Sequence, residues 1–365
     1  MQRIGRYLLP ALLWSLVVAY VGYALSLVRE DRAARRIERL RIEVSDSTAR
    51  GSLVKAAEVH RQIAESGLFR GTKAADSVDL TAIEQLIRRN GFVEGVEASL
   101  SQEGELRVRL SQRTPLIRLR LEGVDGYVTD AGYLFSTPPR SALYVPVVSG
   151  NYRLPVPMGY TGLVRDHIDH RLWQIDTLIR SLERSKYPYF AAERQNDRDL
   201  REVRRMRTSK RWWRFESDEE FEHRVEELRA QKAALRKKYR YRGRQIQASI
   251  DRITEEQEMQ RREQKKLEKK YEDFLKLLTF VEYLEEDEFW GSEVVELIAS
   301  TAPSGALELT LIPRSGRFAV RFGRIEAVEA KFEKLMRFYR RGLATEGWER
   351  YSEVDIRFRG QVVCR

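Results

Sequence analysis

The feature that most constrains the fold of this chain is a seven-residue repeat within a strongly charged stretch. Between Val225 and Val281, apolar or long side chains recur at every seventh position, and leucines occupy a companion position. The column consists of Val225, Lys232, Tyr239, Ile246, Ile253, Gln260, Leu267, Phe274 and Val281, and the companion residues are Leu228, Leu235 and Leu277. A repeat sustained over this length is typical of coiled coils, so the sequence predicts one long helix here.

An earlier apolar stripe offers this helix a partner. The stripe consists of Leu172, Ile175, Leu178, Ile179 and Leu182. A turn near residues 188–196 would pair the two stripes as an antiparallel coiled coil, which we assign to residues 163–272. Pairing between two copies of the chain is the competing arrangement. The seam is weakened by polar or small residues, namely Lys232, Arg242, Gly243 and Gln260.

The segments on both sides of this insertion mix helical and strand patterns, which predicts an α+β fold. Before it, the predicted elements are a strand over 40–44, helices over 52–63 and 81–90, and hairpins over 96–110 and 126–135. Thr81 and Glu84 have the spacing of a capping box at the start of the second helix. After the insertion, the predicted elements are helices over 274–289, 290–299 and 328–339, and strands over 307–312, 318–322 and 351–358.

Short motifs in these flanking segments resemble the FtsQ/DivIB family of cell-division proteins and occur in the family's order. They are Val78-Asp79-Leu80, Gly91-Phe92-Val93, Gln112-Arg113-Thr114-Pro115, Asp287 to Trp290, Leu311 to Gly316, Gly347-Trp348 and Val354 to Arg357. The resemblance implies a cytoplasmic tail (1–7), a transmembrane helix (8–28) and a POTRA domain (36–118). It also implies a β domain in two parts (119–162 and 273–365), interrupted by the charged coiled-coil insertion (163–272) that ordinary members lack.

An uncharged run from Leu8 to Val28 is long enough to cross a bilayer as a helix. A signal peptide with a cleavage site at Gly22-Tyr23-Ala24 is the alternative. More arginines follow the run than precede it, so a simple positive-inside count places the bulk of the chain in the cytoplasm. Long domains, however, translocate largely regardless of charge. The resemblance implies a single-pass protein of the inner membrane at the division septum, with a cytoplasmic N-terminus and a periplasmic bulk.

The composition offers little for catalysis. The chain has four histidines and one cysteine, Cys364, which excludes an internal disulfide and a thiolate metal cluster. His167 and His170, with Asp166 and Asp169, have a spacing that could touch a metal. Because no further residue nearby has ligand spacing, a solvated helix start is the simpler interpretation. We therefore predict no catalytic residues, no metal site, no cofactor and no small-molecule substrate.

The C-terminal residues have the alternating pattern of a strand with one buried face. A strand that ends a chain often lies at a sheet edge, where its free N–H and C=O groups can pair with a strand of another protein. The predicted partner-binding residues are Tyr351, Ser352, Glu353, Val354, Asp355, Ile356, Arg357 and Phe358. By resemblance, the chain is a non-enzymatic scaffold of the division machinery. Its partners are FtsB/DivIC-type and FtsL-type membrane proteins and, indirectly, the septal peptidoglycan synthase complex.

Two other functions fit the sequence. A POTRA-bearing translocation or adhesion factor of the envelope would act through the basic coiled coil. A nucleic-acid binder facing the cytoplasm would use the formal net charge of +11, most of which lies between Thr161 and Lys270. A periplasmic location would exclude nucleic acid as a partner.

A basic and aromatic cluster within the insertion is a candidate membrane-surface contact. It consists of Arg211, Trp212, Trp213 and Arg214. Arginine and tryptophan suit an anionic lipid headgroup layer, whereas a solvated loop is the simpler alternative.

Replacing Arg211, Trp212 and Trp213 together by alanine should weaken binding of the protein to anionic liposomes, because the change removes both charge and interfacial aromatic surface. Liposome co-sedimentation measures the effect. Unchanged binding would assign the cluster to a solvated loop.

Overall fold

The computed structural model describes residues 14, 16–23, 36–45, 53–101, 103–136, 143–211, 215–343, 347 and 350–365. The chain divides into two compact units, of which the first is discontinuous in sequence (Met1–Val164 with Phe274–Arg365) and the second is Arg165–Asp273. Within the predicted membrane segment, residues 14 and 16–23 are helical and the rest lie outside the described residues. None of the helices formed by described residues is long and apolar enough to span a bilayer.

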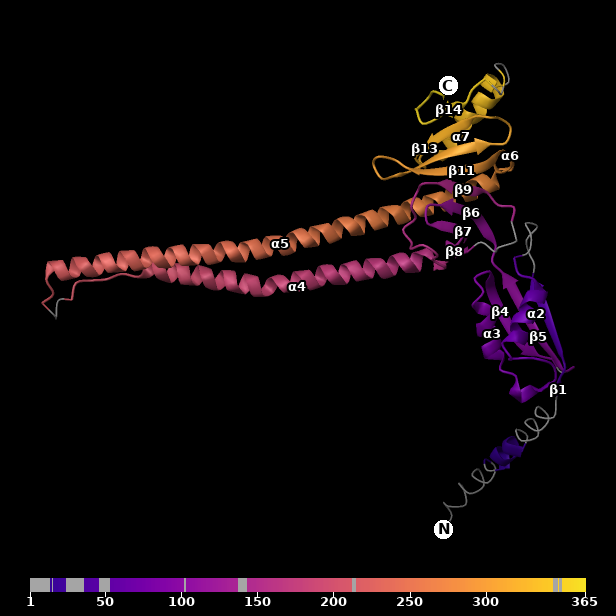
Figure 1. The fold of residues 1–365 in the computed structure, drawn as a ribbon, viewed down its shortest axis with the longest axis horizontal. Helices are drawn as coiled ribbons and strands as arrows, with labels where there is room; N and C mark the ends of the chain where they lie inside the picture. The colour runs from indigo at the N-terminus through magenta and orange to yellow at the C-terminus, as the bar shows by residue number, and fades with distance from the viewer. Residues whose placement is uncertain are drawn as a thin grey trace, which may run out of the picture. The chain divides into compact units, whose positions relative to one another are not determined.

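The first unit begins with a small α+β arrangement (Figure 1). A three-stranded sheet has the order β2 (Arg39–Ser45), β5 (Glu105–Gln112) and β4 (Val93–Leu100), accompanied by helices α2 (Ala56–Glu65) and α3 (Leu80–Arg88). A short pair, β1 (Arg36–Ile37) with β3 (Lys73–Ala74), and the 3-10 turn Ala75–Ser77 complete it. The strand over 40–44, the two helices and the hairpin over 96–110 are thus present as predicted, with β2 parallel to β5.

The start of α3 differs from the capping box that the sequence predicts. The N-cap is Asp79, whose carboxylate accepts a hydrogen bond from the N–H of Ala82 at 2.9 Å. Glu84 instead accepts from the N–H of Ala98 on β4 at 2.9 Å, which ties the helix to the sheet. Helix α3 therefore begins one residue before Thr81, because an aspartate was available to cap it.

The described residues of the rest of the first unit form a ten-stranded mixed sheet and the helices that accompany it. Its order is β10 (Gly162–Leu163), β8 (Tyr133–Ser136), β7 (Val124–Thr129), β6 (Pro115–Leu121), β9 (Val147–Gly150), β11 (Val294–Thr301), β12 (Leu307–Pro313), β13 (Ala319–Gly323), β14 (Glu353–Asp355) and β15 (Val363–Cys364). Strand β9 runs parallel to both β6 and β11, and β13 runs parallel to β14. The remaining pairs are antiparallel. The chain leaves the three-stranded sheet for this one at Arg113–Thr114, between β5 and β6.

The two sheets share a hydrophobic core at this point. Phe92, which precedes β4, packs edge-on against Phe135 of β8 with ring centroids 5.8 Å apart. The Arg113 guanidinium lies 3.5 Å from the ring centroid of Tyr133, a cation–π contact. The residues that we assign to a separate POTRA domain are therefore packed against the first strands of the larger sheet.

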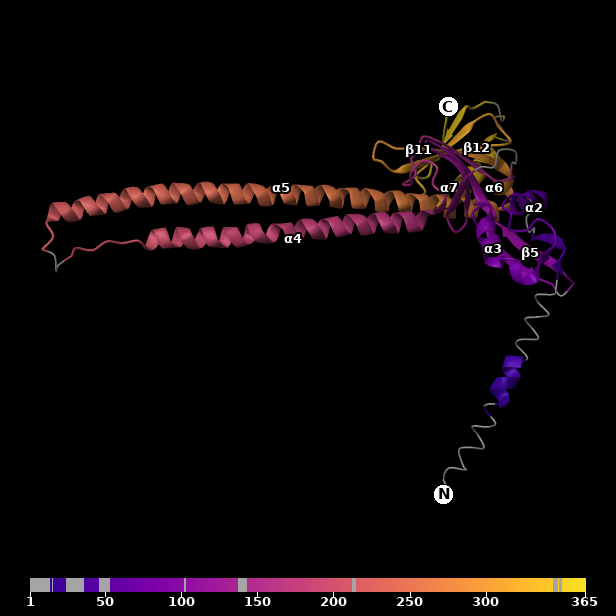
Figure 2. The same ribbon diagram turned by 60° about the horizontal axis from the view of Figure 1, so that its bottom comes forward.

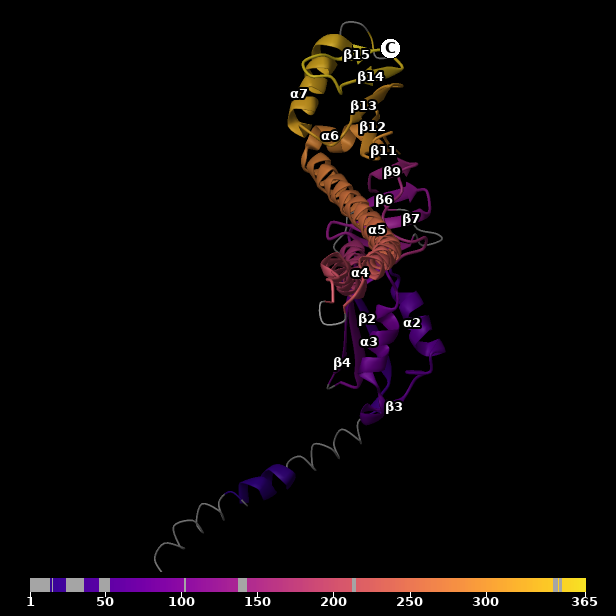
Figure 3. The same ribbon diagram turned by 90° about the vertical axis from the view of Figure 1, so that its left-hand side faces the viewer.

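Helices α6 (Glu288–Glu293) and α7 (Val328–Phe338) lie on one face of the ten-stranded sheet (Figure 3). A π-helical turn, Tyr339–Leu343, extends α7. An aromatic cluster holds the layers together: Phe280 meets Phe322 at 4.9 Å, and Trp290 meets Phe332 at 4.8 Å, between ring centroids. The prediction of a helix over 290–299 is wrong, because β11 begins at Val294 and occupies the middle of the sheet.

The second unit is an antiparallel helical hairpin (Figures 1 and 2). Helix α4 (Val164–Arg205) lies beside α5 (Asp218–Glu286), as cross-contacts at the end where the chain reverses show. Arg242 pairs with Asp199 at 3.6 Å, and the Lys232 ammonium donates to the carbonyl of Met206 at 3.0 Å. The predicted turn near 188–196 is wrong. The chain reverses between α4 and α5, and α4 continues through Pro188, whose side chain is exposed.

The heptad positions from Val225 to Leu267 lie in this hairpin, and the last two, Phe274 and Val281, lie in the first unit. Every residue of the predicted column from Val225 to Val281 is buried or half-buried. One layer is polar: the ammonium of Lys186 donates to Gln257, whose side-chain N–H groups donate to the carbonyl of Ile179 at 3.2 Å and to Glu183 at 2.9 Å. Lys186 and Gln257 are 7 % and 3 % exposed, so this layer satisfies buried polar groups and fixes the helix register.

Replacing Gln257 by leucine should destabilise the hairpin by about 2 kcal/mol, because the nearly buried Lys186 loses an acceptor. Replacing Lys186 and Gln257 together by leucine should recover the stability, since two buried polar groups give way to apolar packing. Thermal unfolding followed by circular dichroism measures both. A single variant as stable as the wild type would show that the layer contributes nothing.

Candidate partner-binding site

The C-terminal strand predicted to bind a partner is short and lies inside the sheet. Strand β14 covers only Glu353–Asp355. Its Val354 is in register with Val320 of β13 on one side and with Cys364 of β15 on the other. The prediction that residues 351–358 form a free sheet edge is therefore wrong, since both sides of β14 are paired within the chain.

The last residues of the chain cause this difference. The N–H of Arg365 donates to the carbonyl of Glu353 at 2.9 Å, and the N–H of Glu353 donates to the carbonyl of Arg365 at 3.1 Å. The N–H of Ile356 donates to Arg321 of β13 at 3.1 Å, so a proline there would break an internal bond. The sequence feature that could have indicated this pairing is Gly360. It has a φ of +77° and lies in the turn that brings the chain back from β14 to β15.

The outer edge of the sheet belongs to β15. In an antiparallel pair, residues alternate between those that exchange hydrogen bonds and those whose N–H and C=O point away. Because Arg365 and Glu353 exchange hydrogen bonds, Cys364 directs its N–H and C=O outward. Burial raises the pKa of the Cys364 thiol. The edge open to another strand therefore lies one strand further out than predicted.

An ion pair fixes the segment that follows β14. The carboxylate of Asp355, which is 6 % exposed, accepts from the Arg357 Nε at 3.0 Å and from Nη2 at 2.6 Å. It also accepts from the Arg357 backbone N–H at 3.0 Å. Burial opposes ionisation of Asp355, but the hydrogen bonds and the charge of Arg357 outweigh it and hold the pKa of the carboxyl below its usual value.

Gly323, at the end of β13, makes room for this arrangement. Its φ is +74°, which disfavours any side chain, and a Cβ there would approach Arg357 Cγ to 2.7 Å. The stem of Arg357 therefore lies directly over the glycine.

A basic groove adjoins β15 and this ion pair. The groove has a volume of about 1180 Å³ and is lined by α7 with its π-helical turn, the segment between β13 and α7, Glu308 of β12 and the chain after β14. Seven lining residues are basic and two are acidic. The basic residues are Arg324, Lys331, Lys334, Arg337, Arg341, Arg357 and Arg359. Phe338, Phe358 and Val362 add apolar surface, and Phe358 is 45 % exposed, whereas Ile356 lies fully buried in the wall of the groove.

Two of these basic residues are engaged with the backbone. The Lys334 ammonium donates to the carbonyl of Ile356 at 2.7 Å and also to the carbonyl of Phe358. The Lys331 ammonium donates to the carbonyls of Phe322 at 3.0 Å and Arg324 at 2.7 Å. Burial lowers the pKa of both lysines. These lysines attach α7 to the walls of the groove, and the arginines supply its accessible charge.

A buried polar cluster lies beneath α7. The Tyr339 hydroxyl donates to Glu293 at 3.2 Å, and the hydroxyl of Ser315 donates to the same carboxylate oxygen. Burial, together with the Glu293 charge, raises the pKa of Tyr339 far above its usual value. The cluster joins the π-helical turn to the end of α6 and to the segment after β12, so its buried polar groups have a structural role.

The other candidate residues lie in the helical hairpin. Arg211 is exposed, and its N–H donates to Glu216 at 2.8 Å, whereas Trp212, Trp213 and Arg214 lie outside the described residues. A ring nitrogen of His170 contacts the amide of Gln174 at 2.9 Å. Burial and the neighbouring Arg171 and His170 lower the pKa of His167. Among the residues that the structure describes, no three His, Cys, Asp or Glu side chains gather as a metal site.

The fold is that of an α+β protein with a large mixed sheet, interrupted by a helical hairpin and ending in a strand pair beside a basic groove. Residues 252–365 match the family described as FtsQ/DivIB, C-terminal related. This range contains the second half of α5 and everything from α6 to β15. The chain is therefore FtsQ/DivIB-like in its C-terminal third, which confirms the resemblance and indicates a role in cell division. The search of curated proteins found no match.

Replacing Asp355 by asparagine should lower the free energy of unfolding by about 2 kcal/mol at neutral pH, because charge-assisted hydrogen bonds are lost. An ionised carboxylate with a lowered pKa stabilises the fold fully above its unfolded pKa of about 4, and this contribution disappears as the pH falls through the lower folded pKa. The difference between variant and wild type should therefore vanish in acid.

Urea unfolding at a series of pH values measures this difference. Glu353→Gln serves as the control, because its ion pair with Arg321 is more exposed and should contribute less than about 1 kcal/mol. A difference for Asp355→Asn that persists unchanged in acid would contradict the assignment.

Proposed function

We propose that the chain is a non-enzymatic, single-pass membrane scaffold of the bacterial division machinery. The POTRA-like N-terminal part and the ten-stranded sheet act outside the cytoplasm, and the sheet recruits FtsB/DivIC-type and FtsL-type partners that lead to the septal peptidoglycan synthase complex. The observation that carries this proposal is the family match over residues 252–365, which includes the strand pair and the groove.

The open edge of β15 supports recruitment by strand addition. A partner strand would pair with the outward N–H and C=O of Cys364 and continue the sheet beyond β15. Each backbone hydrogen bond contributes only about 0.5–1.5 kcal/mol, and β15 is two residues long. The edge therefore fixes the position of the partner, and most of the affinity must come from side chains.

The basic groove supplies that affinity in our proposal. Arg324, Arg337 and Arg359 favour an acidic segment, and Phe358 with Val362 offers apolar surface for an anchor side chain. Two of the residues predicted from sequence as partner-binding, Arg357 and Phe358, thus take part through their side chains, whereas the side chain of Ile356 is fully buried. The proposed contact joins a strand at the edge to an acidic and apolar segment in the groove.

A pair of proline variants tests the position of the added strand. Cys364→Pro removes an N–H that points outward, so it should leave the fold stable and weaken partner binding at least about tenfold. Val363→Pro removes an N–H that faces β14, so it should detach β15 and lower stability. Calorimetric titration with the periplasmic segment of the FtsB/DivIC-type protein from the same genome measures both affinities.

The opposite pattern would place the partner elsewhere. If Cys364→Pro binds normally and Val363→Pro binds more tightly, the partner displaces β15 and adds to β14. Normal binding by both variants would remove strand addition from the proposal.

A further inference from the structure

One exposed face of α5 carries a basic block followed by an acidic block. Lys237, Arg240 and Arg244 form the basic block, and Asp251, Glu255 and Glu258 form the acidic block. All six side chains are exposed. The steps between them are 3, 4, 7, 4 and 3 residues, which keep the six on one side of a helix because 3.6 residues make a turn.

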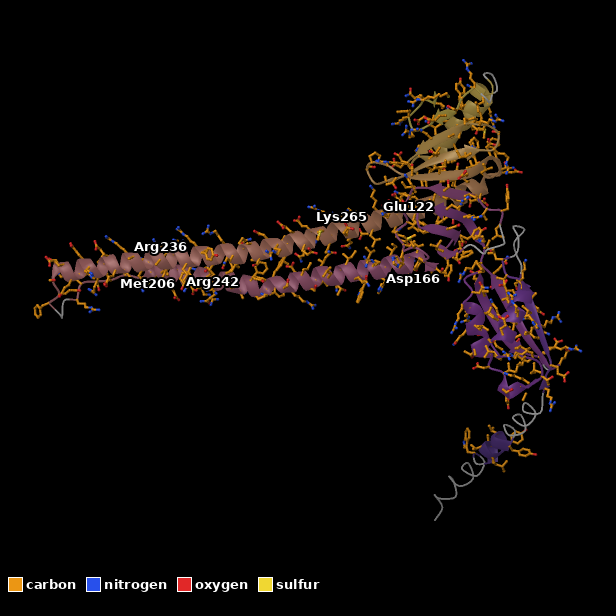
Figure 4. All side chains as sticks on the ribbon, viewed as in Figure 1. Glu122, Asp166, Met206, Arg236, Arg242 and Lys265 are labelled. Atoms are coloured by element: carbon orange, nitrogen blue, oxygen red, sulfur yellow. The ribbon has the colours of Figure 1, made fainter. Side chains whose placement is uncertain are left out.

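This face lies apart from the seam of the hairpin. The seam uses other residues of the same stretch, including Tyr239, Ile246 and Ile253, which are buried or half-buried. Arg242 lies at the seam, where it pairs with Asp199 of α4 (Figure 4). The six charged residues are therefore available to a molecule outside the hairpin.

Several of the six charges have no ionic partner, although ion pairs are common elsewhere in the hairpin. Arg180 pairs with Asp176, and Lys266 pairs with Glu263 at 2.7 Å. Within the described part of the chain, Lys237, Arg240, Arg244 and Glu255 make no ion pair. Asp251 accepts a hydrogen bond from Gln247, and Glu258 pairs with Arg262 at 3.6 Å. The pattern leaves three cations in one row for a partner to neutralise.

The spacing reads the same in both directions. Reversing the series 3, 4, 7, 4, 3 returns the same series, and the reversal exchanges the basic block with the acidic block. Two copies of α5 laid antiparallel about the midpoint between Gln247 and Ala248 therefore oppose every cation with a carboxylate. Arg244 meets Asp251 of the second copy, and Lys237 with Arg240 meets Glu255 with Glu258. The matched segment is about 32 Å long at 1.5 Å per residue.

We propose that this face is an interaction surface for a second copy of the chain. Two hairpins associate antiparallel through residues 237–258 of α5, and the two-fold symmetry repeats each set of ion pairs. A bilayer or a linear polyanion is less suited to this face, because it would attract the basic block and be repelled by the acidic block. This surface on α5 is independent of the partner proposed for β15.

Charge reversal tests the proposal, because two variants that each fail to self-associate should associate with one another. Lys237→Glu with Arg240→Glu makes the face acidic throughout, and Glu255→Lys with Glu258→Lys makes it basic throughout. Exposed ion pairs are individually weak and sensitive to salt, so the wild type should form a dimer that dissociates as salt is raised. Each double variant alone should associate at least about tenfold more weakly, and an equimolar mixture should form a heterodimer.

Sedimentation equilibrium of the full chain in an uncharged detergent measures the association, and co-purification of a tagged variant with an untagged one detects the heterodimer. Arg184→Glu with Arg198→Glu is the matched control: both side chains are exposed on α4, and the net charge changes equally. Circular dichroism verifies that each variant keeps its helices.

Several results would overturn the proposal. These are a monomeric wild type at low salt, unaltered dimers of either double variant, or a mixture that fails to associate although the wild type does. A monomeric wild type that binds heparin or anionic vesicles through Lys237 and Arg240 would assign the face to a polyanion or a membrane.

Discussion

The sheet depends on the parallel pairing of β9 with β11, because these strands come from opposite sides of the helical insertion. Gly150 approaches the carbonyl of Ala299 so closely that a Cβ would lie 2.1 Å from it, and its φ of +124° suits only glycine. The N–H of Tyr152 donates to the same carbonyl at 3.2 Å, and Ser149 donates to Glu296 at 2.6 Å. Everything from β11 to β15, including the groove, is positioned through this junction.

Sequence periodicity predicted the elements whose pattern is repeated many times. The heptad column over Val225–Val281 identified α5 and its seam, because eight successive repeats outweigh single polar residues. Predictions of element boundaries that rested on a single residue were wrong. Pro188 was interpreted as a turn, but the pairing of α4 with α5 along its length offsets the cost of a proline within a helix. Trp290 lies within a short helix, α6, and this helical segment concealed the strand that begins at Val294.

The candidate site shows a second reason why local patterns are insufficient. The alternation around Val354 correctly indicated a strand with a buried face, but its place in the sheet depends on the return of the chain through Gly360. The groove is assembled from Arg324, Arg337 and Phe358, which are separated in sequence and come together only through packing. No periodic pattern connects such residues, so the sequence indicated Phe358 as a contact and missed the arginines opposite it.

The insertion begins and ends beside one turn of the sheet domain. The N–H of Val164 donates to the carbonyl of Gly132 at 3.1 Å, and the ring of Phe274 lies 3.5 Å from where a Cβ of Gly132 would be. Closing a disordered loop of this length would cost about 4 kcal/mol in chain entropy. Because α4 pairs with α5 along its length, the two ends of the insertion are brought together by the hairpin itself. The insertion therefore acts as a rigid connection and removes most of that entropic cost from the folding of the sheet domain.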